Sequence, residues 1–102
     1  MQEHAEKVAA HMGMLANENR LMILCALLQQ PMTVGELGRR VPEISAPALS
    51  QHLHKLKDAG LVSAEKEAQF VRYRISDPHL HKLIALLREE YCPQGLRMET
   101  EA

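Results

Sequence analysis

The sequence predicts a small, mainly α-helical domain that carries one β-hairpin. Three observations support this fold class. Apolar residues recur every three or four positions in most of the chain, as they do on one face of a helix. The spacing changes to strict alternation only over residues 71–75. Helix caps and prolines separate the periodic segments. We expect one domain, residues 1–102, ending in a flexible tail over residues 93–102.

The first two helices are expected at residues 3–16 and 18–30. Asn17 has the side chain of a helix cap and is expected to begin the second helix. Pro31 is expected to end it, because proline lacks the N–H that a helix interior needs. The predicted apolar stripes are Val8, Met12 and Leu15 in the first helix, and Leu21, Leu24, Cys25 and Leu28 in the second.

Two further helices are predicted on either side of a tight turn at residues 42–44. Thr33 caps the first of them, and Glu36 three residues later completes a capping box. Ser45 begins the next, and Gly60 is its C-terminal cap. The residues expected to point inward are Val34, Leu37 and Val41 in the shorter helix, and Leu49, Leu53 and Leu56 in the longer one.

A hairpin and a last helix complete the domain. One strand opens at Leu61-Val62, the turn is expected at residues 66–69, and the second strand covers residues 71–75. Asp77 then caps a helix that begins at Pro78 and is expected to end at Tyr91. The order is four helices, two strands and one helix. This order is that of a winged helix-turn-helix with one additional helix at each end.

A possible DNA-reading face lies opposite the leucine stripe of the fourth helix. At about 100° per residue, that face presents polar side chains that can exchange hydrogen bonds with base edges or meet phosphates. The alternative is the solvated polar face that most surface helices have. The hairpin favours DNA, because basic residues on it can lie along the duplex backbone. The predicted DNA-binding residues are Arg39, Arg40, Ser45, Pro47, Ser50, Gln51, His54, Lys55, Lys66, Gln69, Arg72 and Arg74.

The formal net charge of −1 at first argues against a nucleic-acid-binding protein. The charge is unevenly distributed, however. Residues 39–74 hold seven basic and four acidic side chains, a local charge of +3, and the flanking segments together carry −4. The near-zero total is therefore a cancellation and does not exclude DNA as the partner.

Other functional classes are excluded by length and composition. The longest uninterrupted apolar run, residues 21–28, is far shorter than the roughly 20 residues that span a bilayer, so no membrane partner is expected. The first seven residues lack the features of a signal peptide, and we expect a cytoplasmic protein. Two cysteines are too few for a secreted disulfide scaffold.

Two segments resemble a known family. The run Leu15-Ala16-Asn17-Glu18-Asn19-Arg20-Leu21 through Ile23-Leu24, and the run from Leu49 to Val62, are similar to the arsenic- and metal-responsive (ArsR/SmtB) repressors. The similarity extends over residues 8–92. It implies a homodimer, built by the first and last helices, that represses transcription until an inducer loosens it from a pseudo-palindromic operator DNA.

The metal sites of that family are incomplete here. Residues 34–39, where family members place two cysteines, contain no thiol. In the last helix Asp77 and His79 match the first half of a D-x-H pattern, but Glu90 and Pro93 stand where the second half belongs. An inter-subunit zinc site is conceivable from Asp77, His79, His81 and Glu89 or Glu90. We favour the interpretation that Asp77 is a helix cap and the histidines are exposed, and we predict no resident metal or cofactor.

The residues alone leave the role of the cysteines open. Cys25, on the apolar face of the second helix, can be an inert core residue. The thiolate of Cys92 is disfavoured by the helix C-terminus and favoured by Arg88 one turn earlier.

A resemblance suggests a role for the pair. Leu24-Cys25, Tyr91-Cys92-Pro93 and Glu67-Ala68-Gln69 are similar to the sulfide- and persulfide-responsive branch of the family, which includes biofilm-growth repressors and haemolysin regulators. The branch implies that Cys25 and Cys92 link within one subunit, through a disulfide or a polysulfide, when a sulfane-sulfur donor or oxidant acts as the inducer.

The sequence therefore predicts a DNA-binding repressor controlled by reactive sulfur species or oxidants through Cys25 and Cys92. Two alternatives stay open at this point: a zinc-responsive repressor that uses the last helix, and a winged-helix module that binds a protein. An enzyme is not expected, because the sequence shows no Cys–His–acid arrangement and no phosphate-binding glycine loop.

Overall fold

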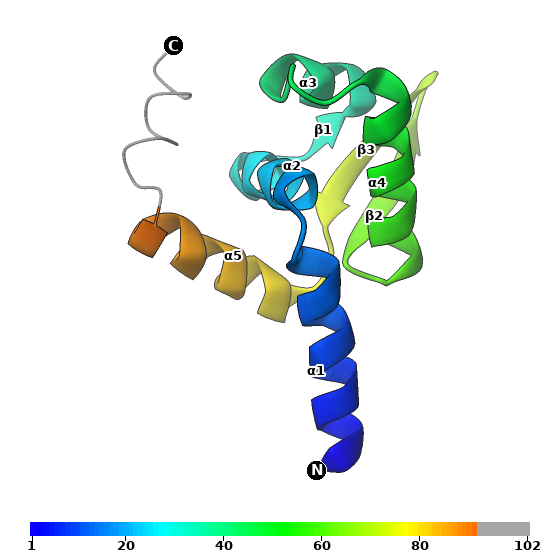
Figure 1. The fold of residues 1–102 in the computed structure, drawn as a ribbon. Helices are drawn as coiled ribbons and strands as arrows, with labels where there is room; N and C mark the ends of the chain where they lie inside the picture. The colour runs from blue at the N-terminus through cyan, green and yellow to red at the C-terminus, as the bar shows by residue number, and fades with distance from the viewer. Residues whose placement is uncertain (92–102) are drawn as a thin grey trace.

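The computed structural model describes residues 1–91 (Figure 1). It confirms a mainly α-helical winged helix-turn-helix in which a β-hairpin follows the fourth helix. The elements in chain order are α1 (Gln2–Leu15), α2 (Glu18–Gln29), β1 (Met32–Thr33), α3 (Val34–Arg40), α4 (Ala46–Asp58), β2 (Val62–Glu67), β3 (Phe70–Ile75) and α5 (Pro78–Tyr91).

The four predicted N-terminal caps are all formed. The side-chain oxygens of Asn17, Ser45 and Asp77 each accept a hydrogen bond from a first-turn backbone N–H, at 3.1, 3.3 and 2.9 Å. Thr33 and Glu36 make the reciprocal bonds of a capping box, at 3.2 and 2.9 Å. Each cap satisfies a backbone donor that a helix start leaves without a partner. Local side-chain chemistry thus sets where four of the helices begin.

Gly60 ends α4 in a Schellman motif. Its φ of +79° is a left-handed conformation that glycine adopts without a Cβ penalty. The Gly60 N–H donates to the Lys57 carbonyl (2.9 Å), and the Leu61 N–H donates to the Leu56 carbonyl (3.0 Å). This reversal directs the chain from α4 straight into β2.

The sheet has one strand more than the sequence predicts. Its order is β1-β3-β2 with antiparallel pairing, and Met32 and Thr33 of β1 lie opposite Tyr73 and Arg72 of β3. The prediction of a two-stranded hairpin was therefore incomplete. A strand of two residues has no alternation, so sequence periodicity cannot reveal it.

The turn of the hairpin, the wing of this fold, is tighter than the expected residues 66–69. Glu67 pairs with Phe70, so Lys66 and Glu67 belong to β2 and residues 68–69 alone connect the strands. Ala68 has a φ of +58°, which is costly for a residue with a side chain. The two-residue connection forces this conformation on Ala68.

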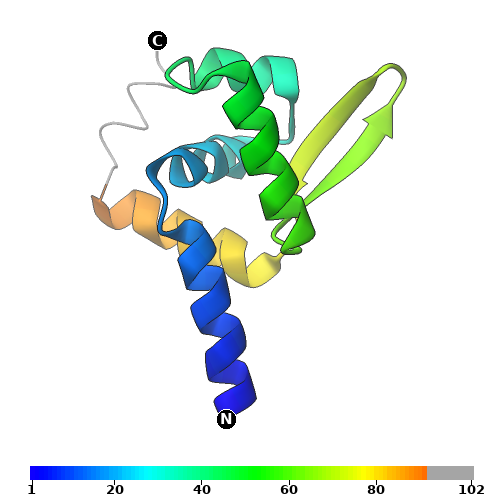
Figure 2. The same ribbon diagram turned by 45° about the vertical axis from the view of Figure 1, so that its right-hand side comes forward.

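The core confirms the leucine stripe of α4 and corrects the stripe of α2. Leu49, Leu53 and Leu56 are all buried, as expected. On α2 the buried residues are Ile23, Leu24, Ala26 and Leu27. Of the predicted stripe, Leu24 is buried, and Leu21, Cys25 and Leu28 are half-buried against the core. The one-sided stripe was incomplete, because α2 lies at the centre of the domain and contacts α1, α3, α5 and β3 (Figure 2).

The outer helices expose apolar side chains. α1 projects away from the rest of the domain, and only its last residue, Leu15, is buried (Figures 1 and 2). Val8 is 55% exposed on α1, and Leu86 is 55% exposed on α5. Met12 and Tyr91 are also exposed. No helix in residues 1–91 is both long and apolar enough to cross a membrane.

Candidate nucleic-acid interface

Helix α4 presents the polar face that the sequence predicts. Ser50, Gln51, His54 and Lys55 line one open hollow of about 410 Å³ on its outer side. Ser45 and Pro47 are exposed at the start of the same helix. Because Leu49, Leu53 and Leu56 anchor the opposite side of α4 in the core, this face is held outward as a rigid surface. Its hydroxyl, amide, imidazole and ammonium groups suit contacts with base edges and phosphates.

The side chains of His54 and Asp58 are in contact on the exposed side of α4. His54 Nε2 lies 3.2 Å from Asp58 Oδ2, one helical turn away. Both side chains are largely exposed, so the pair contributes little to stability. The carboxylate orients the imidazole of His54 on the polar face.

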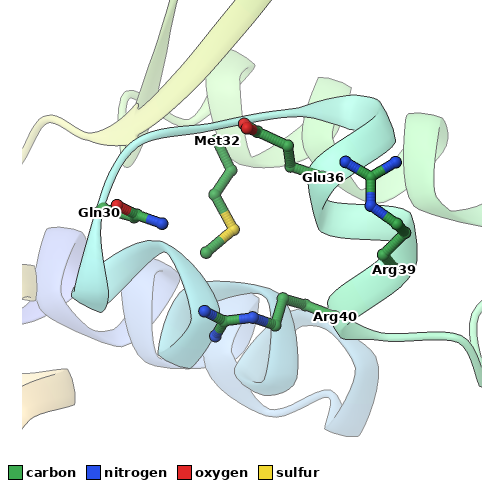
Figure 3. Close-up of a pocket in the computed structure, with 5 residues that line it drawn as sticks. All are labelled: Gln30, Met32, Glu36, Arg39 and Arg40. Atoms are coloured by element: carbon green, nitrogen blue, oxygen red, sulfur yellow. The ribbon is translucent and has the colours of Figure 1, made fainter. Parts of the chain in front are cut away.

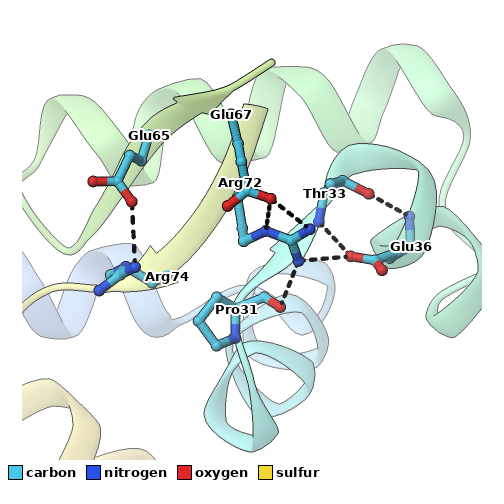
Figure 4. A network of polar contacts seen from close by, with 7 residues as sticks. All are labelled: Pro31, Thr33, Glu36, Glu65, Glu67, Arg72 and Arg74. Atoms are coloured by element: carbon cyan, nitrogen blue, oxygen red, sulfur yellow. Dashed lines mark hydrogen bonds and ion pairs between the residues drawn. The ribbon is translucent and has the colours of Figure 1, made fainter. Parts of the chain in front are cut away.

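Arg72, by contrast, is occupied within the chain (Figure 4). Its guanidinium lies 3.2 Å from Glu36 Oε1 and 3.2 Å from Glu67 Oε1, and it donates to the Pro31 carbonyl at 3.4 Å. The side chain is only 30% exposed. The sequence placed Arg72 among the residues available to DNA phosphates. In the structure it connects the wing to α3, and its contact with DNA stays a prediction.

The other wing residues are more open to solvent. Arg74 Nη2 lies 3.5 Å from Glu65 Oε1, and both side chains are more than half exposed. Lys66 in β2 and Gln69 in the turn are exposed, and Lys66 forms no ion pair within residues 1–91. Lys66 is therefore the basic wing side chain most accessible to a phosphate.

Glu36 is held in its ionised form. The backbone N–H of Thr33 is the main cause that lowers the pKa of Glu36. The positive charge of Arg72 acts in the same direction, and partial loss of hydration opposes it. The carboxylate therefore caps α3 and binds the wing arginine at the same time.

Arg39 and Arg40 line a separate hollow from the α4 face. A pocket of about 250 Å³ lies between the end of α2 and α3 (Figure 3), and its lining residues are Gln30, Met32, Glu36, Arg39 and Arg40. Arg40 Nη1 donates to Gln29 Oε1 at 2.7 Å. The predicted DNA-binding residues thus lie in three places: the outer face of α4, the wing, and the hollow beside α3.

His52 has a partner that the sequence did not indicate. The side chain is half-buried, and its Nδ1 accepts a hydrogen bond of 3.3 Å from Nε of Arg20, 32 residues earlier in the chain. Burial is the main cause that lowers the pKa of His52, and the positive charges of Arg20 and Lys55 add to it. The ring is therefore held neutral, with Nδ1 as an acceptor.

The proposed sensing pair is only partly described. Cys25 is half-buried on α2 and packs against the edge of the core. Helix α2 contacts α5, whose last residue is Tyr91. Cys92 and the predicted tail at residues 93–102 lie outside the described residues. The Cys25–Cys92 link stays a prediction.

The metal alternative gains no support from a single chain. Asp77 acts as a helix cap, since Oδ1 accepts from the backbone N–H of His79 at 2.9 Å. Asp77 and Glu90 stand at opposite ends of α5, about 20 Å apart at the helical rise of about 1.5 Å per residue. Within residues 1–91, no three His, Cys, Asp or Glu side chains gather in a way that could hold a metal ion.

Sequence comparison finds close relatives among bacterial regulators. Residues 17–64 match the family model described as bacterial regulatory protein, arsR family. The chain is 45% identical over 92 residues to the transcriptional activator HlyU of Vibrio cholerae, an alignment that covers 90% of this chain and 84% of that protein. It is 37% identical to the biofilm growth-associated repressor of Agrobacterium fabrum, over 90% of this chain and 78% of that protein.

Structure comparison gives the same result. Reduced HlyU from Vibrio cholerae superimposes with a TM-score of 0.84 at 44% identity, covering 90% of this chain and 96% of that one. A homodimeric winged helix-turn-helix DNA-binding domain from Mycobacterium bovis matches with a TM-score of 0.75 at 31% identity, covering 85% and 80%. These relatives are named as regulators, not as enzymes. The chain belongs to the ArsR family of bacterial transcriptional regulators.

Proposed function

We propose that this regulator is a homodimeric repressor whose affinity for operator DNA falls when reactive sulfur species or oxidants link Cys25 to Cys92. The observation that carries the proposal is the packing of α2 against α5. Cys25 is half-buried on the first of these helices, and Cys92 follows the last residue of the second. A bond between them would join the helix at the centre of the domain to the helix at its edge.

The DNA-binding part of the proposal rests on α4 and the wing. The outer face of α4 offers hydrogen-bonding groups of the kinds that contact base edges in a major groove, and Lys66 is exposed near the end of the wing. A biofilm growth-associated repressor is among the relatives, and another relative is named an activator. Repression by this chain is therefore part of the proposal.

The dimer is proposed to form through α1 and α5. These two helices expose Val8, Met12, Leu86 and Tyr91 within a single chain. Burial of such exposed apolar side chains against a second copy would favour association. The related Mycobacterium bovis domain is homodimeric. A two-fold dimer presents two copies of α4, which read half-sites about 34 Å apart on a pseudo-palindromic operator.

When a sulfane-sulfur donor is the inducer, the chemistry of the switch needs the two protein thiols and one donor molecule. One cysteine thiolate takes the outer sulfur of a donor persulfide and releases the donor as a thiol. The other thiolate then attacks the inner sulfur of the protein persulfide, and hydrosulfide leaves. The two protein thiols are oxidised to a disulfide, and the transferred sulfur atom is reduced. If both cysteines are persulfidated first, their condensation leaves a trisulfide and also releases hydrogen sulfide.

The test compares operator affinity before and after treatment with glutathione persulfide. We expect the affinity of the wild type to fall about 5- to 150-fold, the range of ordinary allosteric couplings, and to recover after reduction. Cys25→Ser and Cys92→Ser should each bind operator normally and ignore the persulfide. If both serine variants respond as the wild type does, the cysteine mechanism is wrong. Intact mass, with glutathione disulfide and peroxide as comparison treatments, identifies the bridge.

A further inference from the structure

The side chain of Arg20 connects three parts of the domain. Nη1 donates to the backbone carbonyl of Met14 at 3.4 Å and lies 3.7 Å from the Met14 sulfur, at the end of α1. Nε donates to Nδ1 of His52 on α4 at 3.3 Å. Arg20 itself lies in the first turn of α2. A single guanidinium thus joins the projecting helix, the central helix and the helix that carries the polar face.

Two hydrogen bonds hold the backbone next to Arg20. The Arg20 N–H donates to the Asn17 side chain at 3.1 Å. The Asn17 N–H donates to the carbonyl of Leu15, the last residue of α1, at 2.7 Å. Asn17, between the two helices, is therefore hydrogen-bonded both to the end of α1 and to the first turn of α2. The planar guanidinium can then hold its two partners in one relative geometry.

His52 is well placed to transmit that geometry to the polar face of α4. Its side chain lies on the flank of the helix, while its neighbour Gln51 and Lys55 one turn later line the outer hollow. Through its other faces α4 packs on α3 and β2. The hydrogen bond from Arg20 to His52 adds a third contact, which connects α4 to α2 and, through Met14, to the end of α1. The lowered pKa favours the neutral ring, and the tautomer that carries its proton on Nε2 leaves Nδ1 able to accept this bond.

We propose that Arg20 is a positioning residue for DNA recognition: it holds α4 at a fixed orientation relative to the end of α1 through His52. The proposal rests on the proposed operator-binding dimer, because α1 then belongs to the interface and α4 to the reading head. A change in the angle between them changes the separation of the two reading heads. Operator DNA, with its fixed half-site spacing, is sensitive to that separation, and nonspecific DNA is not.

A direct phosphate contact by Arg20 makes a different prediction. A side chain that neutralises a phosphate releases about one counterion, so its loss weakens binding to every sequence and lowers the salt slope by about 1. The loss of a positioning residue lowers operator affinity alone and leaves nonspecific affinity and the salt slope unchanged. The two roles are therefore separable by binding measurements on two DNAs at several salt concentrations.

The experiment measures binding to the operator and to a scrambled duplex between about 50 and 200 mM salt. Arg20→Lys keeps the charge but cannot donate to Met14 and His52 in the same planar geometry. We expect Arg20→Lys and Arg20→Ala each to lose about 5- to 50-fold in operator affinity, within the usual range of coupling, with nonspecific binding unchanged. Lys55→Ala, on the polar face, is the comparison variant. It should weaken binding to both the operator and the scrambled duplex and should lower the salt slope of binding.

Variants of His52 test the bond itself. His52→Leu removes the acceptor, whereas His52→Asn places an amide oxygen near the position of Nδ1. We expect His52→Leu to lose as much operator affinity as Arg20→Ala, and His52→Asn to keep nearly the operator affinity of the wild type. The double variant Arg20→Ala/His52→Leu should bind the operator no more weakly than the weaker of its two single variants. Additive losses in the double variant would show that the two residues act separately.

Besides additive losses in the double variant, three further results would overturn the proposal. They are wild-type operator affinity in Arg20→Lys, a lower salt slope in Arg20→Ala, and a proton on Nδ1 of His52 in the ¹⁵N NMR spectrum of the folded protein. The NMR measurement needs no DNA, so it decides on the bond even if the chain does not bind the operator. Failure of the persulfide response with normal operator binding would count against the cysteine proposal alone. Thermal melts of each variant show whether it is folded.

Discussion

The protonation of His52 makes the stability of the folded domain depend on pH. Burial, helped by Arg20 and Lys55, lowers the pKa of His52 below its usual 6.5. As the pH falls below about 6.5, the unfolded chain takes up a proton on this residue before the folded chain does. The stability associated with neutral His52 is therefore complete above pH 6.5 and is lost as the pH falls from there toward the folded pKa.

We expect the free energy of unfolding to fall more steeply in the wild type than in His52→Asn between pH 7.5 and 5.5. The other five histidines are present in both proteins, so their contributions cancel in the comparison. Denaturant titrations at several pH values measure the difference. Parallel pH curves for the two proteins would mean that the ring titrates as an exposed histidine does.

Arg72 also acts at the scale of a single residue, as the side chain that attaches the wing to α3. Its loss would leave Glu36 and Glu67 without their shared cation. Partly exposed ion pairs contribute modestly, so Arg72→Ala is expected to cost about 1 kcal/mol of stability. If Arg72 makes no phosphate contact, Arg72→Ala will bind the operator with the same salt slope as the wild type. A slope smaller by about 1 would support the DNA contact that the sequence suggested.

Among the elements, the connection between α4 and β2 depends on one backbone conformation. Gly60 has a positive φ, and nothing lies within 4 Å of where a Cβ would stand. A Gly60→Ala change is therefore costly through its backbone alone, by about 1–2 kcal/mol. At Gly38, inside α3, a Cβ would also meet nothing within 4 Å, and the φ angle is not positive. Gly38→Ala should instead stabilise by about 0.5–1 kcal/mol. Urea denaturation measures both variants, and equal effects would contradict the conformational explanation.

The elements that sequence reasoning predicted are those with local signals. Asn17, Thr33, Ser45 and Asp77 cap helices by bonds to residues two or three positions away, so their patterns are visible in the chain. The polar face of α4 follows from helix geometry in the same way. Strand β1 was missed because its only support is its pairing with β3 across the fold.

Contacts between distant residues left no trace in the sequence. Arg20 meets His52 32 residues later, and Arg72 meets Glu36 36 residues earlier. The neighbours of these residues in the chain indicate a helix cap for Glu36 and a DNA contact for Arg72, but they indicate neither of the two long-range contacts. The apolar stripe of α2 misled for a related reason. Four elements surround this helix, and a pattern read along one face cannot show burial on the others.

At the scale of the whole molecule, the exposed faces of α1 and α5 predict that stability depends on protein concentration. Folding that is coupled to dimerisation raises the Tm as the concentration increases. Val8→Glu and Leu86→Glu are each expected to weaken the dimer at least about tenfold, because a charge would be buried at the interface. Analytical ultracentrifugation measures the change in the dissociation constant.

Phe70 supplies the matched control for these two changes. Val8, Leu86 and Phe70 are all 55% exposed in the single chain, but Phe70 lies at the end of the wing. Phe70→Glu should leave the dimer intact. If it weakens self-association as much as Val8→Glu does, the interface involves the wing and the assignment to α1 and α5 is wrong.

The projection of α1 from the domain also has a consequence for the order of assembly. Only Leu15 of this helix is buried against its own chain, so in the proposed dimer most of α1 gains its packing contacts when a second molecule arrives. Refolding should then proceed in two stages: a first-order collapse of the segment from α2 to α5, followed by a slower docking of α1 whose rate rises with protein concentration. The helix that precedes all other elements of the domain would be the last to reach its native contacts.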